Sequence, residues 1–169
     1  MRITLILIFI TSVYVAVAQK TPISLGVAGG YNFQTQGFGI DIRATKPLTD
    51  NMRATLRYAN FPSFNMVKET YLGMDLDYII YEALKIDYYG FIGLNYDNWE
   101  NAAESQSSKA KKNNFVVEGG IGAEIKYKMF RPFAEWRYDT KWREGTVFIG
   151  VKFGLNAFAK KDKYRCGHF

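Results

Sequence analysis

The residue types best suited to catalysis are scarce in this sequence and lie near its C-terminal end. The 169 residues include one histidine, His168, and one cysteine, Cys166. A nucleophilic site needs a serine or cysteine beside a base, and a zinc site needs three or four ligands. Cys166 and His168 would bind a metal only with ligands from another chain, so we interpret them as part of a solvated tail. We predict no catalytic residue, no metal and no cofactor.

Two other motifs are weaker candidates for chemistry. GGIGAE at Gly119–Glu124 lacks the third glycine of a dinucleotide fingerprint and falls inside an expected strand. Asp75 and Asp77 face the same side of another expected strand, where pairing with arginines is favoured over metal binding. Both motifs are therefore best understood through the elements that carry them.

Eight segments alternate between apolar and polar positions, which is the pattern of β-strands with two unlike faces. The predicted strands are Ile23–Phe33, Phe38–Lys46, Met52–Ala59, Thr70–Tyr81, Ile86–Tyr96, Phe115–Lys128, Pro132–Asp139 and Thr146–Leu155. The connections after the second, fourth and sixth strands are short, whereas Asn60–Glu69 and Asp97–Asn114 are longer. Short turns at one end and longer loops at the other are typical of an outer-membrane barrel.

The polar faces of these strands carry most of the glycines. Nine of the fifteen glycines lie there, namely Gly26, Gly30, Gly39, Gly73, Gly93, Gly120, Gly122, Gly150 and Gly154. Glycine weakens a strand that faces water, as the polar faces of a soluble lipocalin-like barrel would. In a narrow barrel interior, by contrast, small residues make room for large ones. The glycines therefore indicate that the polar faces point inwards.

The charged residues of the strands also lie on the polar faces, and the apolar faces carry none apart from Lys46 at the very end of the second strand. A charge at the bilayer midplane costs about 2–4 kcal/mol, which explains its absence from a face that meets lipid. Ions buried in a narrow interior must pair. We predict an interior charge network of Asp41, Arg43, Arg53, Arg57, Asp75, Asp77, Asp87, Glu118, Glu124, Lys126, Glu135, Arg137 and Lys152, with Asp139 on the same face.

Aromatic residues on the apolar faces fall into two bands on either side of an aliphatic zone. The predicted girdle consists of Tyr31, Phe38, Tyr58, Tyr78, Tyr88, Tyr96, Tyr127, Tyr138 and Phe153. High β-propensity explains the number of aromatics but not their banding, whereas membrane interfaces explain both. We predict an all-β fold, an eight-stranded antiparallel up-and-down transmembrane β-barrel over residues 19–155.

The two ends of the chain are predicted to lie outside the barrel. Arg2, an apolar run and the A-x-A sequence Ala16–Ala18 indicate a secretory signal peptide over residues 1–18, cleaved near Ala18. The run is short and interrupted for a membrane anchor, which is the alternative. Residues 156–169 form a basic tail on the periplasmic side. Without this tail and Arg2 the charge of +6 is nearly balanced, so a nucleic-acid groove is not expected.

The pattern over Ile23–Leu155 resembles the small eight-stranded outer-membrane barrels of the OmpX/OmpA type. Members of that family often end the last strand in an aromatic residue that the barrel-assembly machinery recognises. Gly150, Phe153 and Leu155 match the spacing of this signal, although the chain continues for 14 residues to Phe169. Lipid A deacylases and palmitoyltransferases, which also resemble this chain, use a catalytic histidine. The single histidine is expected in the periplasmic tail, so we do not expect an enzyme.

We therefore predict a non-enzymatic barrel in the outer membrane of a Gram-negative-type cell, porin-like in architecture but with a filled interior. Its loops would serve envelope structure or surface interaction. The alternatives are an accessory subunit of a larger outer-membrane complex and, as a weaker candidate, a soluble lipocalin-like binding barrel. Expected partners are outer-membrane lipid, lipopolysaccharide, the assembly machinery and other envelope proteins. Lys109, Lys111 and Lys112 are candidate contacts for lipid A phosphates, unless they form an ordinary solvated charge run.

Overall fold

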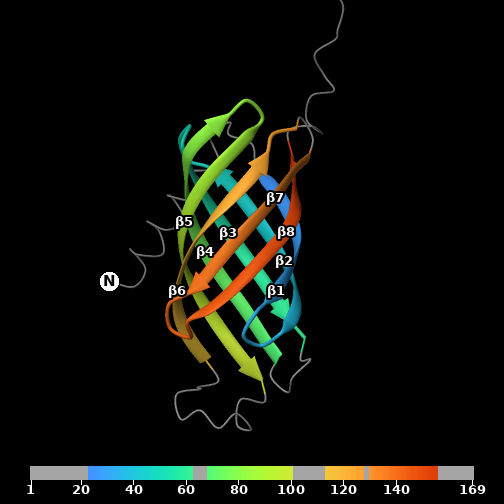
Figure 1. The fold of residues 1–169 in the computed structure, drawn as a ribbon, viewed down its shortest axis with the longest axis vertical. Helices are drawn as coiled ribbons and strands as arrows, with labels where there is room; N and C mark the ends of the chain where they lie inside the picture. The colour runs from blue at the N-terminus through green and yellow to red at the C-terminus, as the bar shows by residue number, and fades with distance from the viewer. Residues whose placement is uncertain (1–22, 63–67, 101–112, 128–129, 156–169) are drawn as a thin grey trace, which may run out of the picture.

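The structure, a computed structural model, describes residues 23–62, 68–100, 113–127 and 130–155. Each strand pairs antiparallel with the next, and β1 pairs with β8 to close a barrel (Figure 1). This confirms the predicted eight-stranded antiparallel barrel. The strands are β1 (Ser24–Asn32), β2 (Gly37–Pro47), β3 (Met52–Phe61), β4 (Lys68–Ala83), β5 (Ile86–Glu100), β6 (Asn113–Ile125), β7 (Phe130–Asp139) and β8 (Glu144–Gly154).

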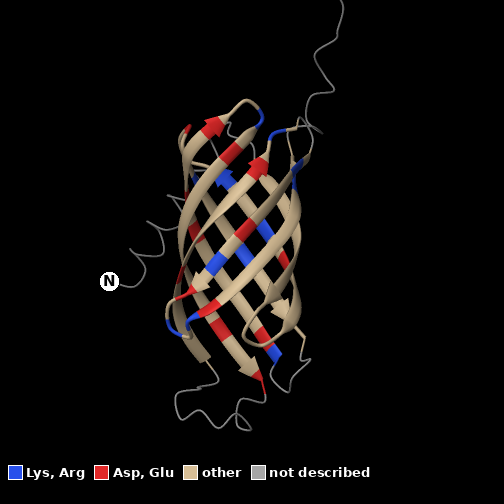
Figure 2. Cartoon of the chain, viewed as in Figure 1, with Lys and Arg blue, Asp and Glu red and all other residues tan. Residues whose placement is uncertain are grey.

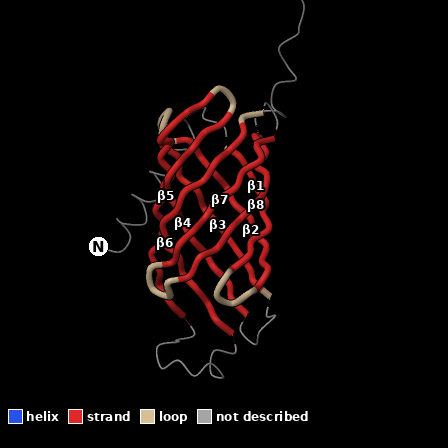
Figure 3. The backbone as a smooth tube through the Cα atoms, viewed as in Figure 1, coloured by secondary structure: helices blue, strands red, loops and turns tan. Residues whose placement is uncertain are grey.

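The connections divide the barrel into two ends. The links from β2 to β3, β4 to β5 and β6 to β7 lie at one end, here called the turn end, at the top of Figure 1. The strand ends that the other four links join lie at the opposite end, here called the loop end. Three turn residues, Gln36, Leu84 and Arg143, have positive φ, which lets the chain reverse within a few residues. Figure 3 shows the described chain as strands joined by loops. Among these residues, no helix is long and apolar enough to cross a membrane.

Several strand boundaries were predicted wrongly. β5 continues to Glu100 and β6 begins at Asn113, so the predicted loop Asp97–Asn114 starts four residues too early. Likewise, β3 and β4 take residues from both ends of the predicted loop Asn60–Glu69. Polar residues in these stretches line the mouth of the barrel instead of marking turns. At the turn end, β7 begins at Phe130, two residues before the predicted start at Pro132. β6 ends at Ile125, three residues before the predicted end at Lys128.

Several of the inward glycines lie opposite large side chains. A Cβ atom at Gly39 would come within 2.6 Å of the Phe61 ring, and one at Gly30 would overlap the ring of Phe148. The outward-facing Gly29, by contrast, has nothing within 4 Å of the same hypothetical atom. Glycine on the inward face therefore gives the aromatic rings their space, because a barrel of eight strands has room for little more than its own side chains.

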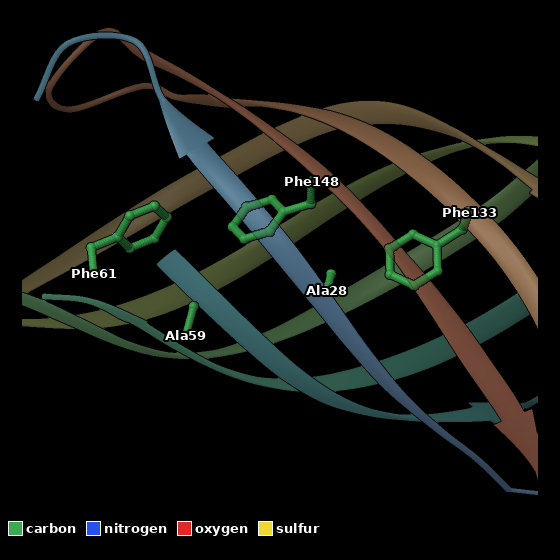
Figure 4. Packing of buried hydrophobic residues seen from close by; sticks show 5 residues of the cluster. All are labelled: Ala28, Ala59, Phe61, Phe133 and Phe148. Atoms are coloured by element: carbon green, nitrogen blue, oxygen red, sulfur yellow. The ribbon is translucent and has the colours of Figure 1, made fainter. Parts of the chain in front are cut away.

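A small apolar cluster runs along part of the interior. It consists of Ala28, Ala59, Phe61, Phe133 and Phe148 (Figure 4). The rings of Phe61 and Phe148 lie 6.1 Å apart in an edge-on arrangement, a geometry that aromatic pairs favour. Tyr71 packs against Phe61, with ring centroids 5.8 Å apart. The cluster therefore packs among the charges of the interior, where the Phe133 ring lies against the Arg43 guanidinium.

The outer surface of the barrel is apolar. Ile149 on β8 and Leu94 on β5 are 68% and 63% exposed, and no charged residue shares their face along the middle of the strands. Eight of the nine predicted girdle residues are exposed on this surface, and Tyr31 is half-buried. At the loop end Tyr31 packs against Phe38 and Tyr96 against Phe115; at the turn end Tyr127 packs against Phe130. The outside therefore presents aliphatic residues between two groups of aromatic side chains.

Candidate functional site

The centre of the barrel is filled by ion pairs that join strands on opposite sides (Figure 2 marks the charged positions). Arg137 on β7 contacts Asp75 on β4 at 2.6 Å and Glu118 on β6 at 3.0 Å. Its guanidinium also lies 3.0 Å from Glu135 on its own strand. Arg137 and Asp75 are each 1% exposed. Three carboxylates thus surround one buried guanidinium, whose five N–H donors suit such multiple contacts.

Two further arginines extend this arrangement. Arg43 on β2 reaches across the barrel to Glu135 at 2.6 Å and also binds Asp41 at 2.6 Å. Arg57 on β3 binds Asp41 at 2.9 Å and Glu118 at 3.0 Å. Every carboxylate in this group therefore accepts hydrogen bonds from at least one arginine. Pairing of this kind is what makes the burial of charges tolerable.

A second group of charges continues the network towards the turn end. Glu124 on β6 lies 2.7 Å from Lys152, 3.3 Å from Arg53 and 3.3 Å from Arg131. Arg53 also lies 3.7 Å from Asp77, which accepts a hydrogen bond from Thr55. At the rim, Lys126 pairs with Asp87 at 3.0 Å and with the exposed Glu82. These contacts link β3, β4, β5, β6, β7 and β8.

Aromatic rings fill the space between the charges. The guanidinium of Arg137 lies 4.1 Å from the centre of the Phe91 ring, and that of Arg43 lies 4.3 Å from the centre of Phe133. Tyr89 lies beneath Arg53 and donates its hydroxyl to Glu135 at 2.7 Å. Cation–π contacts of desolvated arginines contribute about 2 kcal/mol each. The rings therefore stabilise the network as well as filling it.

The inward-facing charges of the centre and turn end balance. Seven acids (Asp41, Asp75, Asp77, Asp87, Glu118, Glu124 and Glu135) pair with seven bases (Arg43, Arg53, Arg57, Lys126, Arg131, Arg137 and Lys152). The thirteen residues predicted to form an interior network all belong to this set. Arg131 was missed because the sequence placed it in a connection, whereas it belongs to β7.

The loop end is different, because four inward-facing acids there have no ion pair with a described base. Glu69 accepts a hydrogen bond from the Tyr71 hydroxyl at 2.5 Å, and Glu144 accepts one from the Asn32 amide at 3.1 Å. Asp139 accepts backbone N–H groups at 2.7 and 2.8 Å. Asp97 is 0% exposed, and neither of its carboxylate oxygens has a hydrogen-bond partner among the described residues. We call these four residues the loop-end acids.

Glu69 and Asp97 lie beyond the loop-end aromatic residues, so they are outside the segments that would span a membrane. Burial, together with the negative charges of Glu118 and Asp139, raises the pKa of Asp97 to about 8. Burial also raises the pKa of Glu69 to about 7, although the hydrogen bond from Tyr71 opposes this. Both carboxyls therefore hold protons over a pH range in which an ordinary carboxyl is charged.

An indole pair adjoins the loop-end acids. Trp99 on β5 and Trp142 in the β7–β8 turn lie with their ring centres 4.6 Å apart, and Trp99 is 8% exposed. The indole N–H of each ring has no hydrogen-bond partner among the described residues. The Lys141 ammonium lies 4.9 Å from the Trp142 ring and donates to the Asn114 side chain at 2.8 Å. Sequence analysis missed Glu69, Asp97 and Trp99 because it assigned all three to loops.

Small cavities lie at both ends of the network. One, of about 10 Å³, lies where the centre meets the loop end and is lined by Arg57, Glu118, Asp139 and Glu144 among others. Another, of about 40 Å³, is lined by Arg53, Glu124 and Arg131 near the turn end. Across the described ranges, no three acidic, cysteine or histidine side chains are placed to hold a metal ion. GGIGAE lies within β6, where Gly120 and Gly122 face Phe91 and Tyr89.

Several predicted features fall outside the described residues. They are the signal peptide, the tail with Cys166 and His168, and the candidate lipid A contacts Lys109, Lys111 and Lys112. The structure therefore leaves these predictions as they stand.

Solved structures of the same architecture match this chain. The N-terminal β-barrel domain of Pseudomonas aeruginosa OprF superposes with a TM-score of 0.61 at 17% identity, covering 79% of this chain and 97% of that one. Neisserial surface protein A (NspA) gives 0.58 at 13% identity, with 80% and 96% covered. The chain has the fold of the small outer-membrane barrels. The Yersinia pestis outer-membrane protein Ail, in a phospholipid nanodisc, gives 0.55 at 11% identity, with 80% and 100% covered.

The predicted resemblance to OmpX/OmpA-type barrels is thus confirmed at the level of the fold. No protein-family model matches the sequence, and no curated protein matches it.

Proposed function

We propose that the protein is a non-enzymatic integral outer-membrane barrel, closed to diffusion, which serves envelope structure or surface interaction through its loop end. The observation that carries this proposal is the inverted polarity of the barrel. Its outside is apolar, and its inside holds charges in mutual ion pairs. Water-soluble barrels have the opposite arrangement, because apolar side chains leave water when the chain folds.

The closed interior is supported by how the network crosses the barrel. Arg43, Arg57 and Arg137 each bind a carboxylate from a distant strand, so the side chains span the lumen. Eight strands enclose only enough space for such side chains. In a planar bilayer we expect no steady conductance from the purified protein. A stable conductance comparable to that of a diffusion pore would contradict this part of the proposal.

Localisation is tested by fractionating cells that express the full chain and comparing unboiled with boiled samples on a gel. We expect the chain in the outer membrane, processed near Ala18, with an unboiled form that migrates differently from the boiled form. A soluble periplasmic protein would overturn the proposal and support a lipocalin-like barrel. Mass spectrometry of the mature N-terminus tests the cleavage.

On this proposal the loop end faces the outside of the cell. Lys109, Lys111 and Lys112 then bind lipid A phosphates. Charge-assisted contacts between lysines and phosphates are the physical basis. Replacing all three with glutamine should weaken binding to lipopolysaccharide, whereas glutamine at Lys46, at the turn end, should not. Co-purification of a larger envelope complex that disappears when residues 156–169 are removed would favour the accessory-subunit alternative.

A further inference from the structure

The cavity at the turn end has a lining with more positive than negative charge. Its volume is about 40 Å³, and it lies where β1 begins and where β2 and β8 end. Two arginines, Arg53 and Arg131, and one acid, Glu124, contribute the charged groups of the lining. The other lining residues are uncharged, namely Ser24, Thr45, Pro47 and Gly154. Such a lining suits an anion better than a cation.

The one acid of this lining is already bound by bases. Glu124 accepts hydrogen bonds from Lys152 at 2.7 Å and from Arg53 and Arg131 at 3.3 Å each. The only other acid in ion-pair range of these three bases, within the described ranges, is Asp77, which lies 3.7 Å from Arg53. Three bases thus share two acids, and one positive charge beside the cavity is left without a counter-charge in the part of the chain that the structure describes.

Arg53 supplies the donors that an anion would need. It is 5% exposed, and its Nε and Nη2 atoms have no hydrogen-bond partner among the described residues. These two nitrogens lie on the same edge of the guanidinium and form a fork that fits the two oxygens of a carboxylate. Asp77 does not fill the fork, because 3.7 Å is too long for a hydrogen bond and its carboxylate accepts one from Thr55. Buried donors without an acceptor are costly.

The size of the cavity limits what can enter it. A space of about 40 Å³ takes about three water-sized groups. The carbon and two oxygens of a carboxylate match this space, whereas a phosphate or sulfate is larger. The Arg131 side chain is 41% exposed, so the site can be reached from the turn end. The Ser24 hydroxyl, whose contact with the Thr45 carbonyl is 3.4 Å long, is a further donor at the same place.

We propose that this cavity binds a carboxylate group, which the free fork of Arg53 holds and the Arg131 guanidinium attracts. In the orientation proposed above, the turn end faces the periplasm. The ligand is then either a free small acid or the carboxylate at the end of a peptide chain. Binding itself does not depend on that orientation, so its failure would leave the outer-membrane assignment untouched.

The test is a titration of the ¹⁵N-labelled full chain, folded in detergent micelles at pH 7 and constant ionic strength, followed by nuclear magnetic resonance. The probes are acetate for a free acid, N-acetylglycine for a peptide end and N-acetylglycinamide as the uncharged control. We expect the amide signals of Ser24 and Gly154, which line the cavity, to shift in a saturable way with at least one of the two carboxylates. The signal of Gly145 at the loop end should stay in place. Whichever carboxylate binds more tightly identifies the source.

Three variants test the residues that form the site. Arg53→Lys keeps the charge but removes the planar fork, and it should weaken binding at least tenfold. Arg131→Gln should weaken it at least threefold, whereas Arg143→Gln, the same change in a loop-end turn, should leave it within twofold. A gel shift on heating checks that each variant is folded.

Gly154→Leu tests the cavity without changing any charge. A Cβ atom at Gly154 meets nothing within 4 Å, so the leucine side chain can be added at the edge of the cavity and should abolish binding. The proposal would be overturned if neither carboxylate gave a saturable shift, which would leave the cavity to water. Equal binding of chloride or of N-acetylglycinamide, or an unchanged affinity in both Arg53→Lys and Gly154→Leu, would overturn it as well.

Discussion

The centre of the barrel and its loop end both bury carboxylates, but they neutralise them differently. In the centre, Asp75 and Glu135 lie 2.6 Å from arginine nitrogens that come from opposite strands. At the loop end, Asp97 is equally buried and has no such partner among the described residues. The centre therefore holds its charges as fixed pairs, and the loop end holds carboxyls whose raised pKa lets them take up protons. The ion pairs of the centre therefore have a structural role, whereas the carboxyls of the loop end change their protonation state with pH.

The largest expected effect comes from breaking the centre. Replacing Arg137 with methionine leaves three carboxylates without their shared partner, and breaking a buried pair costs about 3–5 kcal/mol of unfolding free energy. Urea unfolding in micelles, followed by tryptophan fluorescence, measures the loss. The control is Lys68→Met, which breaks the exposed pair with Glu100 and should cost less than about 1 kcal/mol. Equal losses in the two variants would mean that the central pairs stabilise the barrel no more than the exposed pair does.

The next effect tests why the charges lie inside at all. Ile149→Lys puts a charge on the outer surface near mid-strand and should destabilise the inserted barrel by about 2–4 kcal/mol. Leu84→Lys makes a similar change in the fully exposed β4–β5 turn and should be close to neutral. Refolding yield and unfolding in lipid vesicles report the difference. If both variants insert equally well, the outer surface does not face lipid.

A smaller effect concerns the space that the centre needs for its rings. Gly30→Ala should destabilise by about 1–3 kcal/mol, because the added methyl overlaps Phe148 inside the barrel. Gly29→Ala, one residue away on the outer face, meets nothing within 4 Å and should be neutral or slightly stabilising. Paired urea titrations of the two variants measure the contrast. A larger loss for Gly29→Ala would reverse the assignment of the faces.

The remaining effect concerns the loop end, where a carboxyl that binds a proton avoids most of the cost of a buried charge. The pKa of Asp97 is raised to about 8 and that of Glu69 to about 7. Each carboxyl is therefore protonated to a greater extent in the folded state than in the unfolded state, from about pH 4 up to its pKa in the folded state. Their contribution to stability is present below pH 4 and is lost as the pH rises towards 8.

Unfolding titrations between pH 5 and pH 9 check this prediction. Asp97→Asn should flatten the upper part of the decline, because asparagine does not titrate. The groups that face Asp97 and share in its titration are Glu69, Glu118, Asp139 and Lys141. The same slope in the variant as in the native chain would show that Asp97 is not the titrating group.

The sequence predicts the two faces of each strand well because a period of two follows directly from strand geometry. Asp41, Arg43 and Lys152 needed no other information to be placed inside. Strand ends were harder, because Asp97 and Asn98 have the residue types of turns but continue β5. The loop-end acids were missed for this reason. Individual partners were also beyond prediction, since Arg43 and Glu135 are separated by 92 residues and meet only through the curvature of the barrel.

The pairing of β1 with β8 has a consequence for the order of events during folding. The ion pairs across the lumen join β2 to β7, β3 to β6 and β4 to β7, so none can form while the sheet is open. Until β1 pairs with β8, the charged side chains of these ion pairs remain hydrated. Closure therefore exchanges water for fixed partners in one concerted step. We expect the barrel to unfold as a single cooperative unit, without a stable half-opened sheet.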